Sequence, residues 1–151
     1  MDALNIKYKI KTAVKKEIYF HLKECEDNFN PPLGDRVEIK EYSKKIFENS
    51  ITFEAWLDNI LIGLVSTYFN DNQTHIGYIT NVSIVKNYMR SGIASKLLNM
   101  CITYARQNNF KEIRLEVNES NNNGFNLYKK FNFIKYGEKD CLFFMKLIIN
   151  K

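Results

Sequence analysis

The segment Asn87–Leu98, NYMRSGIASKLL, carries the residues that most directly indicate chemistry, because basic side chains stand where a helix should begin. A helix N-terminus holds partial positive charge and unpaired N–H groups, so Arg90 and Lys96 are unfavourable there unless an anion lies between them. Gly92 lets a ligand approach the backbone without a Cβ in the way. The segment predicts a phosphate site, although an exposed loop before an amphipathic helix needs no ligand. It matches neither the P-loop nor the complete dinucleotide-binding motif.

The elements that position this segment follow from the spacing of apolar residues. The chain is expected to begin with a strand and two helices, joined by a loop that contains Pro31-Pro32 and Gly34. Three strands with short turns between them then predict an antiparallel meander. The predicted segments are residues 4–11 (strand), 13–27 and 38–49 (helices), and 51–57, 60–69 and 75–85 (strands).

Beyond the meander the apolar period changes to that of a helix over 92–107, and then to that of a strand over 113–117. A strand, a helix and a strand in this order predict a crossover unit whose two strands lie parallel. A helix over 122–131 and strands over 133–139 and 141–148 complete the chain. We therefore predict an α+β fold: a single-layer mixed, mostly antiparallel sheet with helices on both faces, formed by one domain over residues 1–151.

Composition narrows the classes of function. The chain has 151 residues and a formal net charge of +5, but its basic residues occur in pairs and not in one dense patch, so no nucleic-acid partner is expected. Three widely spaced cysteines and two histidines offer no metal-binding spacing, so no metal is expected. The charged N-terminus and the lack of a long apolar run predict a cytoplasmic protein without a membrane segment or membrane partner.

Two stretches resemble the signatures of one family. ITNVSIVKNYMRSGIASKLL is similar to the acyl-CoA-binding motif [QR]-x-x-G-x-[GA] of the GNAT superfamily of acetyl-CoA-dependent N-acetyltransferases. RLEVNESNNNGFNLYKKFNFIKYGE resembles the second signature of the superfamily, with Asn121 and Tyr128 at its Asn and Tyr positions. The order of elements also matches along the whole chain. The resemblance implies this fold, acetyl transfer from acetyl-CoA as co-substrate, and a cytoplasmic transferase.

The resemblance also implies which residues bind the co-substrate. The strand before the motif would bind the pantetheine arm, and the loop amides would bind the diphosphate. Met89 stands where Gln or Arg is usual, which leaves a backbone cradle intact but puts one side-chain contact in doubt. The implied cofactor-binding residues are Val82, Ser83, Ile84, Met89, Arg90, Ser91, Gly92, Ile93, Ala94, Ser95, Asn121 and Tyr128.

Proton transfer requires an acid and a base. The resemblance implies that Tyr128 protonates the departing thiolate, a role suited to a phenol, although a packing role among aromatic neighbours is the alternative. No Asp or Glu lies between His75 and Lys86, on the strand where many relatives carry a carboxylate. The base therefore stays open among His75, Tyr78 acting through a water, the carboxylates Glu116 and Glu119, and a chain of waters to solvent.

The resemblance implies a primary amine as acceptor, and a small molecule is expected to carry it. Because no cysteine falls in either signature, a covalent acyl-enzyme is not indicated, and the amine is expected to attack directly in a ternary complex. In similar proteins the first two helices and their loop cover the acceptor, which implies contacts with Phe29, Asp35 and Arg36. Trp56, on a nearby predicted strand, is a further candidate contact, with a packing role as the alternative. Two alternatives remain: acetylation of a protein or peptide amine, and a CoA-binding sensor that has lost catalysis. The resemblance leaves a homodimer open.

Overall fold

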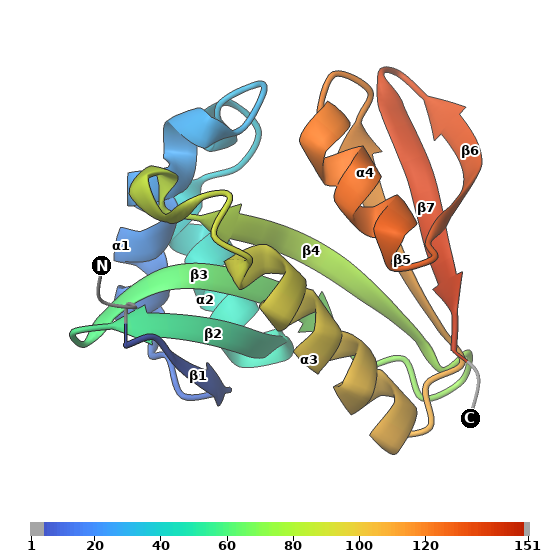
Figure 1. The fold of residues 1–151 in the computed structure, drawn as a ribbon, viewed down its shortest axis with the longest axis horizontal. Coiled ribbons are helices and arrows are strands. Elements are labelled where there is room, and N and C mark those ends of the chain that lie inside the picture. Colours follow the sequence, from blue (N-terminus) through green and yellow to red (C-terminus); the bar gives the residue numbers. More distant parts are fainter. Residues whose placement is uncertain (1–4, 150–151) are drawn as a thin grey trace.

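The computed structural model describes residues 5–149; Leu4 of the predicted first strand and the ends of the predicted domain 1–151 lie outside the described residues. One seven-stranded sheet runs through them in the order β1-β2-β3-β4-β5-β7-β6 (Figure 1). Neighbouring strands are antiparallel except for the parallel pair β4 and β5, which confirms the predicted crossover. The strands are β1 (Lys7–Ile10), β2 (Ile51–Leu57), β3 (Ile60–Tyr68), β4 (Ile76–Ile84), β5 (Glu112–Asn118), β6 (Ile134–Lys139) and β7 (Leu142–Ile148).

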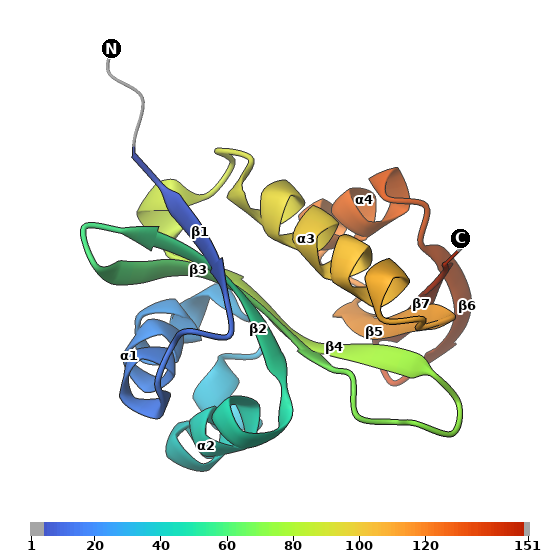
Figure 2. The ribbon, with the colours of Figure 1, turned by 90° about the horizontal axis from the view of Figure 1, so that it is seen from below.

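Among residues 5–149, four α-helices cover the sheet from two sides, as predicted. The helices α1 (Lys15–Cys25) and α2 (Ile39–Asn49) pack on β2, β3 and β4, whereas α3 (Ile93–Gln107) lies on the opposite face together with α4 (Asn122–Lys130) (Figure 2). Their starts follow local capping. The Glu38 carboxylate accepts from the Glu41 N–H at the start of α2, and the Asn121 side chain caps α4.

Each face has its own core. One core lies between the sheet and α3 and α4, with Phe53, Leu97 and Ile113 among its fully buried members. The other lies beneath α1 and α2 and includes Ile18 and Leu64. These apolar stripes have the helical and strand periods read from the sequence, and their burial is what fixes the helices on the sheet.

A buried carboxylate ties the first strand to the second. Glu54 is fully buried and accepts five hydrogen bonds from the turn before α1 and from its own strand. Its donors are the Thr12 N–H and hydroxyl, the Ala13 N–H, the Thr52 hydroxyl and Trp56 Nε1. A buried charge is tolerated only when its lone pairs are satisfied in this way, so Glu54 has a structural role.

Candidate active site

The loop between β4 and α3 leaves a row of backbone N–H groups without partners. It begins with a short turn, η3 (Lys86–Tyr88), onto which the Ser91 hydroxyl folds back to donate to Tyr88 O. Within the described residues no backbone N–H of Arg90–Ser95 donates a hydrogen bond, and the bonds that enter α3 start from Lys96. These successive amides have the arrangement that binds phosphate at a helix start.

Three features of this loop fit an anionic ligand. Gly92 has a φ of 86°, and a Cβ at that position would meet no atom within 4 Å, so the space in front of the amides is open. The first turn of α3 has no acidic residue and no side-chain cap. The basic side chains of Lys86, Arg90 and Lys96 are all exposed around it. The predicted cradle therefore has both the donors and the charge that a diphosphate needs.

The strands beneath this loop diverge. β4 and β5 pair only from Ile76 to Tyr78 with Glu112–Arg114, although both strands continue well beyond, and they open into a V (Figure 1). On its other side β4 carries an extra residue, Thr80, where its register with β3 shifts. Such a bulge increases twist and bends a strand away from its neighbour. The backbone of Val82–Ile84 thus has one edge paired with β3 and one edge facing the opening, as expected for a strand that holds an extended ligand.

Comparison with known proteins identifies this arrangement. A family model described as the acetyltransferase (GNAT) family matches residues 16–133. The chain belongs to the GNAT acetyltransferase family. It is 27% identical over 113 residues to streptothricin acetyltransferase A of Bacillus subtilis, covering 72% of this chain and 63% of that protein. It is 30% identical over 107 residues to an N-alpha-acetyltransferase of Saccharolobus solfataricus, covering 64% and 60%. The chain thus spans about three fifths of the length of these two curated relatives.

The fold is that of solved GNAT structures. PaiA N-acetyltransferase from Thermoplasma acidophilum, solved in complex with coenzyme A, superposes with a TM-score of 0.73 at 14% identity and covers 94% of this chain and 99% of that one. This likeness confirms the predicted fold class, including the mixed sheet and its helices on both faces.

Tyr128 lies in α4 on the side of the V that faces α3. It is 7% exposed, packs near Phe133, and its hydroxyl has no hydrogen-bond partner among the described residues. Burial raises the pKa of Tyr128, so the phenol keeps its proton at neutral pH. Asn121 is occupied as the cap of α4, where its Oδ1 accepts from the Gly124 N–H at 2.9 Å. A Cβ at Gly124 would come within 2.5 Å of the Asn121 amide, which explains a glycine at that position of a GNAT helix.

The opposite side of the V holds Tyr78 and Glu116. Tyr78 pairs with Arg114 in the last register position before the strands part, and Glu116 follows two residues later on the same face. Burial, with the Glu116 carboxylate nearby, raises the pKa of Tyr78 to about 12. Tyr78 therefore stays protonated at neutral pH and suits hydrogen-bond donation better than proton removal.

His75 and Glu119 lie elsewhere. His75 occupies the turn before β4, where its carbonyl accepts from the Lys111 N–H and its ring contacts Phe110, at the closed end of the V. The loop between β4 and α3 is at the other end of α3. Glu119 lies in the turn after β5, beside the exposed Cys141. Of the four candidate bases, the structure brings Tyr78 and Glu116 together at the opening and leaves the other two outside it.

The loop between α1 and α2 reaches across to β5. The Asn30 side chain donates to the Ser120 hydroxyl, and Asn118 donates back to Asn30 O. In this loop Phe29 is half-buried under the Arg36 guanidinium, 5.8 Å from its ring centre, and Asp35 is exposed. The predicted acceptor residues Phe29, Asp35 and Arg36 thus border the opening.

Trp56 is placed differently from the other predicted acceptor residues. It lies in β2, which β3 separates from β4, is 7% exposed, and donates to Glu54. Trp56 therefore has a packing role: its Nε1 donates to Glu54 and its ring is part of the core beneath α1 and α2.

Sequence reasoning missed a buried histidine that anchors β4. His21 of α1 is 3% exposed, with Nδ1 2.9 Å from Leu61 O and Nε2 2.9 Å from the Ser83 hydroxyl. On α2, Tyr42 donates to Thr80 O at 2.8 Å. Each of these contacts joins β4 to a helix that is distant in sequence. The sequence signal for them was a polar side chain, His21 or Tyr42, on the apolar stripe of a helix.

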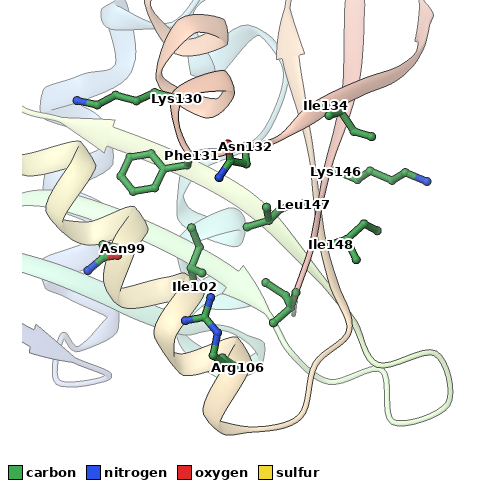
Figure 3. Close-up of a pocket in the computed structure, with 11 residues that line it drawn as sticks. Asn99, Ile102, Arg106, Lys130, Phe131, Asn132, Ile134, Lys146, Leu147 and Ile148 are labelled. Carbon is green, nitrogen blue, oxygen red and sulfur yellow. The ribbon is translucent and has the colours of Figure 1, made fainter. Parts of the chain in front are cut away.

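A cavity of about 580 Å³ lies apart from the V, between the C-terminal half of α3, the end of α4 and β7 (Figure 3). Figure 3 shows Ile102, Phe131 and Leu147 pointing into it, while Lys146 and Ile148 point to the other side of β7. Within residues 5–149, no helix has the length and apolar character to cross a bilayer, and no group of three His, Cys, Asp or Glu side chains could hold a metal ion.

Proposed function

We propose that the protein transfers the acetyl group of acetyl-CoA to a primary amine of a small molecule, by direct attack in a ternary complex. The observation that carries this proposal is the position of Glu116 and Tyr128 on opposite sides of the opening that begins after Tyr78. When bound, acetyl-CoA supplies the acetyl group as a thioester. The amides of Arg90–Ser95 would hold its diphosphate, and the backbone of Val82–Ile84 its pantetheine arm.

The two side chains divide the proton transfers. An amine must lose a proton before it can attack. The Glu116 carboxylate would take up this proton, on the face of β5 that α1 and α2 do not cover. As the new C–N bond forms and the C–S bond breaks, Tyr128 donates its phenolic proton to the leaving sulfur. Its raised pKa keeps that proton available at neutral pH. Tyr78, protonated beside Glu116, orients the incoming amine by a hydrogen bond.

The test measures CoA release with a panel of small amines, after binding of acetyl-CoA has been established by calorimetry. Glu116→Gln and Tyr128→Phe are each expected to lower kcat by about 100-fold while binding of acetyl-CoA persists. Glu119→Gln is the matched control, because this carboxylate lies outside the opening, and it should keep the wild-type rate. Binding without turnover on any amine, peptides and proteins included, would instead identify a CoA sensor. Turnover on protein or peptide amines alone would replace the small-molecule acceptor.

A further inference from the structure

We infer that the acceptor is a small primary amine that carries a negatively charged group near its nitrogen. This inference rests on the proposed function, because it concerns the surface from which the amine would reach Glu116. That surface, called here the acceptor face, is the side of β5, β7 and β6 opposite α3 and α4. Figure 2 shows α1 and α2 beneath the first four strands and no helix beneath these three.

The register of the strands defines this face. Tyr78, Arg114 and Lys146 form one row across β4, β5 and β7, and Glu116 lies in the next row with Phe144. Figure 3 confirms that Lys146 points away from the α3 side of β7. Adjacent strands are about 4.8 Å apart and alternate residues about 7 Å apart, so the cationic row lies within about 10 Å of Glu116.

Charges of both signs lie on this face, and they differ in whether they are paired. Arg114 forms an ion pair with Glu112, but Lys146 on this face and Arg36 on the facing loop form no ion pair within residues 5–149. Arg36 lies close enough to Tyr42 to lower the pKa of that phenol against the larger effect of its burial. On the facing loop the exposed Asp35 lies next to Arg36 in sequence, so these two charges offset one another. If Glu116 serves the amine, the unpaired charge in the neighbouring row of the sheet is that of Lys146, and an anionic group on the acceptor would satisfy it.

Two aromatic rings along this row, those of Tyr136 and Tyr68, are already covered by cations of the protein itself. The Arg114 guanidinium lies 5.4 Å and Lys146 Nζ 5.2 Å from the centre of the Tyr136 ring. Lys45 Nζ lies 5.4 Å from the Tyr68 ring at the other end of the row. A polycationic amine would therefore find these cation–π positions occupied and like charges beside them, which disfavours it as acceptor.

The experiment compares amines of similar size and different charge. Glutamate, aspartate and phosphoethanolamine are tested against ethanolamine, putrescine and spermidine, by calorimetric titration into protein saturated with CoA and by kcat/KM for CoA release. The anionic amines are expected to bind and react about tenfold better. Comparison of glutamate and aspartate with phosphoethanolamine shows whether the site prefers a carboxylate or a phosphate.

Charge reversal makes the test specific. Lys146→Glu should remove the preference for anionic amines and improve the use of putrescine, with little change for ethanolamine. Lys135→Glu is the matched control, because Lys135 lies in the same hairpin, stacks on Phe143 and pairs with Glu138. Equal or tighter binding of the cationic amines, or an unchanged preference in Lys146→Glu, would overturn the inference. In either case, acetylation of any small amine would leave the proposed function standing, so the two failures are distinguishable.

Discussion

The buried imidazole of His21 predicts a measurable loss of stability in mild acid. Its Nδ1 donates to Leu61 O. Its Nε2 lies 2.9 Å from the Ser83 hydroxyl, which donates its own proton to Asn81 Oδ1, and 3.8 Å from the Cys25 thiol, which can donate to the neutral ring. Burial lowers its pKa from 6.5 to about 4, and the hydrogen bonds to Leu61 and Ser83 offset only part of this effect. Protonation would place a charge in a site that is 3% exposed.

The magnitude and sign follow from the two protonation equilibria. The unfolded chain takes up the proton as the pH falls through 6.5, whereas the folded protein does so only near 4. The free energy of unfolding is therefore unaffected above 6.5 and decreases as the pH falls from 6.5 towards 4. At about 1.4 kcal/mol for each tenfold difference in proton affinity, the full loss is about 3 kcal/mol, of which about 2 kcal/mol has appeared by about pH 5.

The assay is urea unfolding of the wild type and of His21→Gln between about pH 7.5 and about pH 5. The variant is expected to be less stable at the higher pH, because the packing is altered, but to lose about 2 kcal/mol less across this interval. Carboxylates contribute equally to both proteins and cancel in the difference. The ring proton signals of His21, assigned by comparison with His75→Gln, should show a neutral ring throughout. Parallel pH profiles, or an imidazolium signal for His21 at about pH 6, would refute the reasoning.

Two further predictions concern the fold and the loop. Glu54→Gln replaces an acceptor of five hydrogen bonds with a group that must turn an amide NH₂ toward some of the donors, and should cost about 3 kcal/mol in urea unfolding. The exposed Glu48→Gln is its control, and equal midpoints for both variants would contradict the structural role. Gly92→Ala should cost about 1 kcal/mol of stability for its positive φ and should also weaken binding of acetyl-CoA about tenfold, because the new Cβ enters the space before the amides. Asn109→Ala removes a residue with a φ of 64° at the far end of α3, so it should leave that affinity intact; equal losses of affinity in both variants would count against the cradle.

Much of the fold could be predicted because the apolar residues of each element recur with the spacing of a helix or of a strand. The strand Ile51–Leu57 agrees with its prediction residue for residue, and the change to helical spacing before α3 correctly predicted the parallel neighbour β5. Several helix ends differ from their predictions by one or two residues, since they depend on caps such as Glu38 at the start of α2 and not on the apolar stripe. The loop before α3 could be proposed as a phosphate site from the sequence because its amide donors are consecutive, and this stays a prediction.

The surroundings of the opening were not readable in this way, because they depend on contacts between distant segments. The contact from His21 to Ser83 joins residues 62 positions apart, and the period of α1 shows only that His21 faces inward. Alternation places Trp56 and Glu54 on one face of β2, but it does not show that Trp56 Nε1 donates to the buried Glu54 carboxylate. Alternation along the predicted strand 113–117 shows that Glu116 lies on the face opposite its apolar residues. Only the pairing of β4 with β5 places it near Tyr78.

In the proposed mechanism, the divergence of β4 from β5 is what would allow Glu116 and Tyr128 to serve one reaction. In a continuous sheet, groups on opposite faces are separated by the backbone layer and cannot reach the same substrate. Here the pairing of β4 with β5 stops after Tyr78, so a substrate placed in the opening could contact side chains from both faces of the sheet. β5 is held on its other edge by seven register positions with β7, and β4 by β3, by Tyr42 on Thr80 and by His21 on Ser83. The strands are therefore kept apart by contacts on their outer edges and on the acceptor side, which is why residues remote from the reacting atoms, such as His21, should affect acetyl transfer through the position of β4.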